Sequence, residues 1–140
     1  MRPHVLIVDD SIDQQKLMSL VFKMVDPNLR VDSAENGNVV LEKLCSDPNS
    51  RPDVIFLDLR MPGLSGIEMI KEMKSDPHLK YIPICAFSNG KLQKDICECY
   101  ALGASFYFQK PCGLEALKDF ATNFRYLWFE IATLCSTEEL

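Results

Sequence analysis

The sequence lacks long apolar stretches and a surplus of basic residues. None of its apolar runs approaches the roughly 20 residues that a membrane-spanning helix needs, so we expect no membrane segment. The first apolar run already ends at the acidic pair Asp9 and Asp10, which excludes the apolar core of a signal peptide and predicts a cytoplasmic protein. The 15 Lys and Arg stand against 20 Asp and Glu, and the net charge of −5 argues against a nucleic-acid surface.

The chain also lacks the cysteine spacing of a metal site. Six cysteines are present, but no two of them form a Cys-x-x-Cys pair. Cys97 and Cys99 fall on an expected helix and would point about 200° apart, which is wrong for joint ligation. We therefore expect free thiols in a reducing compartment.

The 140 residues suffice for one domain, and short apolar runs alternate with longer amphipathic stretches along the whole chain. Strands are predicted at Val5–Val8, Leu29–Ala34, Val54–Leu57, Ile82–Phe87 and Ser105–Phe108. Helices are predicted between them, at Ser11–Val25, Gly37–Leu44, Gly66–Lys74 and Leu92–Leu102, with Asp-Pro steps after the first three. Several strands are apolar on both faces, as a buried parallel sheet demands. The pattern predicts a single α/β domain, a doubly wound five-stranded parallel sheet of (βα)5, flavodoxin-like type.

Polar groups follow four of these strands, where such a sheet places its binding crevice. Asp9 and Asp10 follow the first strand, Asp58 the third, Ser88 the fourth and Lys110 the fifth. One Asp alone could be a helix cap, but the coincidence at four strand ends favours a site. Three carboxylates held together repel each other unless a hard cation such as Mg²⁺ (or Mn²⁺) binds. One carboxylate could then attack phosphorus, with the ammonium and hydroxyl groups binding phosphoryl oxygens.

With these motifs the chain resembles, over about residues 4–122, the receiver domain of two-component response regulators. The resemblance rests on Val8-Asp9-Asp10, Asp58-Leu59-Arg60-Met61-Pro62 with Gly66, Phe87-Ser88, Gly103-Ala104, Tyr107 and Lys110-Pro111. It implies a signalling phosphoacceptor rather than an enzyme, in which Asp58 takes a phosphoryl group from a sensor histidine kinase or phosphotransfer protein. It also implies that Asp10, Asp58 and the backbone carbonyl of Arg60 bind Mg²⁺, with Asp9 acting through water.

The same resemblance implies how the phosphorylated state is read. Ser88 and Tyr107 look like the hydroxyl and aromatic switch pair, which would change the face that a downstream protein target contacts. Lys110-Pro111 resembles the usual cis peptide of the family. Arg60 and Asn89 depart from the common pattern beside the site, and we expect them to tune the lifetime of the phosphorylated state.

The last part of the chain predicts an extended final helix. We expect residues 1–122 to form the receiver core and 123–140 to extend its last helix within the same domain. Because so short an extension leaves no room for an output domain, we expect a stand-alone receiver. Helical spacing from Leu114 onward predicts about 20 helical residues with an apolar overhang. We expect the overhang to form a homodimer interface through Phe124, Leu127, Trp128 and Ile131, and the alternative is that it packs on its own domain.

The aromatic-rich tail resembles the stand-alone response regulators of phytochrome kinases. Among receivers, a chemotaxis-like regulator is the competing output.

Two other functions fit the same architecture less well. An aspartyl-phosphate phosphatase of the haloacid dehalogenase type would have an acid two residues after its nucleophile, where this chain has Arg60. A flavodoxin-like mononucleotide-binding protein would need a phosphate loop after the first strand, where Asp9 and Asp10 stand instead.

Overall fold

The computed structural model describes residues 3–61, 64–90 and 92–135. Pro62, the last residue of the motif that begins at Asp58, lies outside these ranges. The strands are β1 (His4–Val8), β2 (Arg30–Ala34), β3 (Val54–Leu57), β4 (Ile84–Ser88) and β5 (Phe106–Gln109). The helices are α1 (Ile12–Val25), α2 (Gly37–Ser46), α3 (Gly66–Ser75), α4 (Gln93–Leu102) and α5 (Leu114–Arg125). No helix within the described ranges is both long and apolar enough to cross a membrane.

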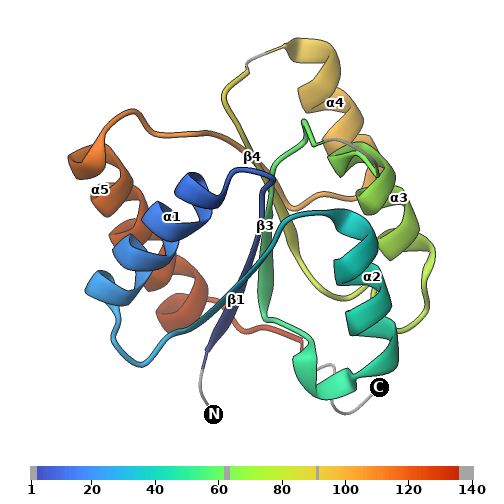
Figure 1. Cartoon of the computed structure of the whole chain (residues 1–140), viewed down its shortest axis with the longest axis horizontal. Coiled ribbons are helices and arrows are strands. Elements are labelled where there is room, and N and C mark those ends of the chain that lie inside the picture. The colour runs from blue at the N-terminus through green and yellow to red at the C-terminus, as the bar shows by residue number, and fades with distance from the viewer. Residues whose placement is uncertain (1–2, 62–63, 91, 136–140) are drawn as a thin grey trace.

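The predicted sheet is confirmed. Its five strands are all parallel and lie in the order β2-β1-β3-β4-β5, which places the reversal of strand order between β1 and β3. Helices α1 and α5 cover one face, and α2, α3 and α4 cover the other (Figure 1). The central strands are apolar on both faces because both faces are covered.

Alternate residues of each central strand enter two separate cores. In β1, Val5 and Ile7 pack with α1 and α5, whereas Leu6 and Val8 pack with α2 and α3. The α1/α5 core is rich in aromatic rings, and Phe56 of β3 lies at its centre, 4.7 Å from the ring of Phe124 and 5.4 Å from that of Phe22. The side chains that the central strands β1, β3 and β4 contribute to the two cores are almost completely buried, which fixes the register of the sheet.

The helix boundaries follow the capping signals of the sequence. Ser11, Asn36 and Ser65 are the N-caps of α1, α2 and α3, and each side chain accepts a hydrogen bond from the backbone N–H three residues later. The three Asp-Pro steps end these helices as predicted, with Asp26, Asp47 and Asp76 as C-caps. In each step the Asp carboxylate also accepts a bond from the N–H two residues on.

The predicted extension of the last helix is present. α5 continues as a π-helical segment, Tyr126–Ile131, so the helical stretch runs from Leu114 to Ile131. Its apolar side chains do not all face outward, however. Phe124 and Trp128 are 5% and 8% exposed, and the Trp128 ring lies 5.1 Å from that of Phe124 and 5.9 Å from that of Phe106.

This packing corrects half of the expected dimer interface. Phe124 and Trp128 are already buried in the single chain, because their rings stack on each other and pack against Phe56 and Phe106 of the sheet. Arg125 helps to fix the segment Tyr126–Ile131 next to α1, because its guanidinium pairs with Asp26, the C-cap of α1, at 3.0 Å and with Glu130 of the segment. Leu127 and Ile131 remain 48% and 59% exposed.

Candidate functional site

The predicted site residues converge at the carboxyl edge of the sheet. Backbone hydrogen bonds just beyond the strands fix them, with Asp58 N–H donating to Val8 at 2.9 Å and Lys110 N–H donating to Ser88 at 2.8 Å. β1, β3, β4 and β5 are successive neighbours in the sheet, so the residues that follow them lie side by side. Residues more than a hundred positions apart in sequence thus come into contact.

Three carboxylates form one cluster. Asp9, Asp10 and Asp58 each offer an oxygen, and these oxygens lie within 4.8 Å of one another. Asp9 is buried, Asp58 is partly buried and Asp10 is exposed to solvent. All donors are hard oxygens with an open side toward water, and this set suits Mg²⁺ or Mn²⁺ better than a softer metal.

Lys110 inserts its ammonium group between two of these carboxylates. Its Nζ lies 3.0 Å from Asp9 Oδ2 and 3.4 Å from Asp58 Oδ2, and its side chain is 9% exposed. One cation against three carboxylates leaves the cluster with excess negative charge. The cluster therefore still attracts a divalent cation.

Asp58 is held in two ways. Its Oδ1 accepts a hydrogen bond from the backbone N–H of Arg60 at 3.1 Å, while its Oδ2 faces Lys110. Burial raises the pKa of Asp58, and Asp9 adds to that effect, whereas the Arg60 N–H and Lys110 oppose it. The net pKa lies above the ordinary value, so the ionised carboxylate is less stabilised than one in water. A cation bound beside Asp58 would stabilise the ionised carboxylate.

Two supporting residues surround this cluster. Gly66, at the first position of α3, approaches the Asp58 backbone so closely that an added Cβ would lie 2.6 Å from the Asp58 carbonyl oxygen. Gln15 was missed by the sequence analysis; its buried Nε2 donates to the Asp9 carbonyl at 2.6 Å and to the Ala34 carbonyl at 3.2 Å. A signal was available, because Gln15 is a polar residue on the same helical stripe as the buried Met18 and Phe22.

The two expected switch residues lie on adjacent strands. Ser88 ends β4 and is 4% exposed, while Tyr107 of β5 is partly buried and packs against the core formed with α2, α3 and α4. Phe106 and Phe108 point to the opposite core, as alternation predicts. The Tyr107 hydroxyl donates to the Gly90 carbonyl at 2.6 Å, in the loop that follows Ser88.

The expected cis peptide between Lys110 and Pro111 is absent. No peptide bond in the described part of the chain is cis. Trans is the lower-energy form of an X-Pro bond by roughly 0.5–1 kcal/mol. Lys110 reaches both carboxylates with the trans bond.

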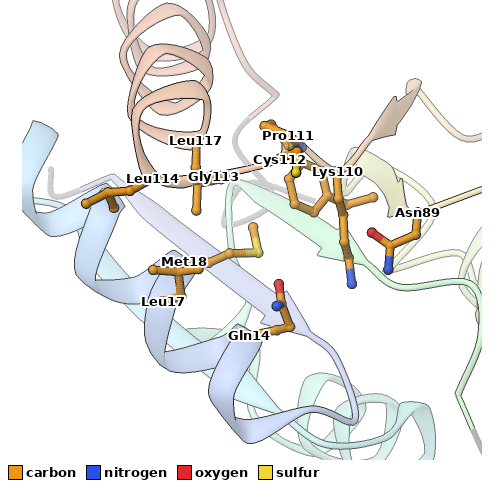
Figure 2. Close-up of a pocket in the computed structure, with 11 residues that line it drawn as sticks. Gln14, Leu17, Met18, Asn89, Lys110, Pro111, Cys112, Gly113, Leu114 and Leu117 are labelled. Carbon is orange, nitrogen blue, oxygen red and sulfur yellow. The ribbon is translucent and has the colours of Figure 1, made fainter.

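A pocket of about 290 Å³ opens beside Lys110. Figure 2 shows that it lies between α1, which contributes Gln14, Leu17 and Met18, and the Lys110–Leu114 segment. Apolar side chains line most of it, and the Lys110 side chain reaches along one edge. A partner seated here would lie directly beside the carboxylate cluster.

Comparisons with known proteins find a matching family and several similar proteins. Residues 5–122 match the model of the response regulator receiver domain. The two-component response regulator ARR17 of Arabidopsis thaliana is 34% identical over 134 residues, covering 87% of this chain and 86% of that protein. The chain also aligns, at 35% identity over 114 residues, with 24% of the length of a probable cyclic di-GMP phosphodiesterase of Vibrio cholerae.

Two solved structures share the whole fold. The phosphorylated cyanobacterial phytochrome response regulator RcpA is 28% identical and superposes with a TM-score of 0.89 over 97% of this chain and 100% of its own. The Mn²⁺-bound form of the response regulator Rcp1 is also 28% identical, with a TM-score of 0.84 over 96% of this chain and 99% of its own. Both similarities extend well past residue 122, into the final helical segment.

Proposed function

Because the chain belongs to the response regulator receiver domain family, we propose that Asp58 accepts a phosphoryl group from a phosphohistidine of a sensor histidine kinase or phosphotransfer protein. The observation that carries the proposal is the contact of Asp58 with Lys110 inside a cluster of three carboxylates. Arg60 stands where a haloacid dehalogenase phosphatase would have its general acid, which disfavours that alternative.

The residues of the site supply distinct parts of this transfer. An Asp58 oxygen attacks phosphorus, the phosphorus–nitrogen bond breaks, and the imidazole leaves with the electron pair. Lys110 turns from the Asp58 carboxylate toward a phosphoryl oxygen. Asp9, Asp10, Asp58 and the Arg60 carbonyl would hold Mg²⁺ or Mn²⁺, which supplies positive charge against the phosphoryl oxygens. The relative Rcp1 was solved in a Mn²⁺-bound form, which supports divalent-cation binding here.

We propose further that the phosphorylated state is read through Ser88 and Tyr107. Ser88 donates its hydroxyl to a phosphoryl oxygen, which changes the packing beside it. Tyr107 then exchanges its bond to the Gly90 carbonyl for an inward position. The surface formed by α4, β5 and α5 responds and contacts the downstream protein.

The pocket beside Lys110 is a suitable entry for the phosphodonor. Its apolar walls on α1 and at the start of α5 would receive a helical partner, and the ammonium group at its edge faces the incoming phosphoryl group (Figure 2). The relation to RcpA favours a phytochrome kinase as the donor.

The test is phosphorylation with acetyl phosphate and Mg²⁺, followed by intact mass. We expect wild type to gain one phosphoryl group and Asp58→Asn to gain none. Asp13→Asn is the matched control, because Asp13 is an exposed carboxylate on α1 that is not part of the cluster. Equal modification of wild type and Asp58→Asn would overturn the assignment.

We also propose a homodimer built on the exposed part of the final helical segment. Leu127 and Ile131 stay exposed beside the buried Trp128 and offer adjacent apolar contacts. Sedimentation at micromolar concentration should show dimers for wild type and monomers for the double variant Leu127→Ser, Ile131→Ser. Leu20→Ser, at a comparably exposed leucine of α1, should leave the dimer intact. A monomeric wild type, with or without phosphorylation, contradicts the proposal.

A further inference from the structure

Arg60 connects the phosphorylation site to α4. Its backbone N–H donates to Asp58 at 3.1 Å, while its guanidinium lies 3.8 Å from the carboxylate of Asp95 in the first turn of α4. The guanidinium also lies over the loop between β4 and α4, because a Cβ added to Gly90 would meet Arg60 Nη2 at 3.6 Å. One residue thus contacts both the phosphoacceptor and the helix beyond it.

The ion pair between Arg60 and Asp95 is easily exchanged. The Arg60 side chain is 71% exposed and that of Asp95 is 33% exposed, so water screens the attraction. The separation of 3.8 Å is too long for a direct hydrogen bond. Such a pair yields readily to a stronger anion within reach of the same guanidinium.

The first turn of α4 lacks a side-chain cap. Leu92 occupies its N-cap and has no side-chain group that could accept from the free N–H groups of that turn. α1, α2 and α3, in contrast, each begin with a side-chain cap. Loss of the Arg60 contact therefore loosens α4 at its start more than a capped helix would be loosened.

We propose that the Arg60 guanidinium leaves Asp95 to bind the phosphoryl group on Asp58, and that this exchange releases the first turn of α4. The inference rests on the proposed phosphorylation of Asp58. A phosphoryl group brings up to about two negative charges and three acceptor oxygens, and guanidinium binds such oxygens in a two-pronged geometry that Lys110 does not provide. Since the Arg60 backbone is already anchored at Asp58, only its side chain needs to turn.

The released turn belongs to the same region as the proposed switch. The Gly90 carbonyl, which accepts from the Tyr107 hydroxyl, lies in the loop under the Arg60 guanidinium. Departure of the guanidinium thus affects the loop that holds Tyr107 as well as α4. Movement of the Arg60 side chain would thus transmit the effect of phosphorylation at Asp58 to the proposed output surface.

A double-mutant cycle tests the exchange. Affinity for beryllofluoride in the presence of Mg²⁺ is measured by fluorine NMR in wild type, Arg60→Gln, Asp95→Asn and the double variant. Glu98→Gln is the matched control, because it removes the same charge from the same helix without an ion pair to Arg60. We expect Asp95→Asn to tighten binding about two- to fivefold beyond the effect of Glu98→Gln, the range for releasing one exposed ion pair.

The cycle also separates the possible outcomes. In the Arg60→Gln background, Asp95→Asn should tighten binding only as much as Glu98→Gln does. An equal gain from Asp95→Asn with and without Arg60 would overturn the exchange. If wild type binds no more beryllofluoride than Asp58→Asn, the proposed function itself fails, which is a different result.

Hydrogen exchange gives a second measurement, and beryllofluoride would not change it if Arg60 only stabilised the fold. The N–H of Ile96 donates to the Leu92 carbonyl at 3.1 Å and reports the first turn of α4. Beryllofluoride should speed its exchange in wild type, whereas in Asp95→Asn it should be fast from the start and unchanged by the ligand. Equal protection of Ile96 with and without beryllofluoride in wild type would refute the release of α4.

Discussion

Replacement of Gly66 by alanine tests the geometry that holds Asp58 in place. An added Cβ would lie 2.5 Å from Leu59 Cα and 2.6 Å from the Asp58 carbonyl oxygen, and both are backbone atoms. An ordinary contact begins at 3.4 Å, so the difference from 2.5 Å requires a backbone shift of about 0.9 Å. The Gly66 N–H also donates to the Leu59 carbonyl at 3.2 Å, which limits how far the two segments can separate.

The expected cost follows from two opposing effects. Overpacking against backbone costs about 1–3 kcal/mol, while the lower entropy of the unfolded chain returns about 0.4–1 kcal/mol. We expect Gly66→Ala to lose about 1–2 kcal/mol of unfolding free energy. Because the displaced atoms carry Asp58, phosphorylation by acetyl phosphate should slow by roughly tenfold or more.

Gly37→Ala is the matched control. Gly37 also occupies the first position of a helix, after the side-chain cap Asn36, but its added Cβ would meet the end of the Leu64 side chain at 2.9 Å. A side chain can turn aside, so the variant should stay within about 0.5 kcal/mol of wild type and should phosphorylate normally. Urea unfolding and intact mass measure both effects. Similar results for the two glycine variants would refute the reasoning.

Three further predictions follow from burial. Burial raises the pKa of Asp58 above 3.8 in the folded state, so ionisation of this carboxylate destabilises the fold. The stabilising contribution of the protonated group is fully present below pH 3.8 and is lost as the pH rises through the folded pKa. Without divalent cations, Asp58→Asn should therefore be more stable than wild type at neutral pH, and urea unfolding should show the gap closing toward pH 3.8; a gap independent of pH would contradict this. Trp128→Ala should cost about 3–5 kcal/mol of unfolding free energy. Trp128→Phe should cost much less, because the buried indole N–H finds no partner in the described part of the chain; equal losses from the two substitutions would contradict this. Burial raises the pKa of the Cys85 thiol to about 12 and that of Cys99 to about 11. Iodoacetamide should therefore modify only the exposed Cys45, Cys97, Cys112 and Cys135 of the native protein, as measured by mass spectrometry of peptides. Early modification of the buried Cys85 or Cys99 would contradict this.

Much of the fold was predictable because local signals agreed with the final packing. The doubly apolar runs became central strands, and each Asp-Pro step ended its helix. The ends of strands shifted by one or two residues; β4, for example, begins at Ile84 rather than Ile82. The carboxylate cluster was predictable too, since parallel strands bring their carboxyl ends to one edge.

What sequence reasoning missed depends on contacts between distant segments. Helical spacing placed Trp128 on an apolar stripe, but it could not show that Phe106 and Phe124 would receive the ring. The spacing of Arg60 from Asp58 likewise gave no hint of Asp95, thirty-five positions further on. The resemblance implied a cis Lys110-Pro111 bond, but the bond is trans.

The seating of Trp128 has a practical consequence for choosing domain boundaries. The family match stops at residue 122, but two rings that complete the α1/α5 core, Phe124 and Trp128, come later. A fragment trimmed to the match would lose the contact of the Trp128 ring with Phe106 and the ion pair between Arg125 and Asp26. The cooperative folding unit is thus longer than the shared motif, and chimeras that graft this receiver onto another output should keep the chain through Ile131.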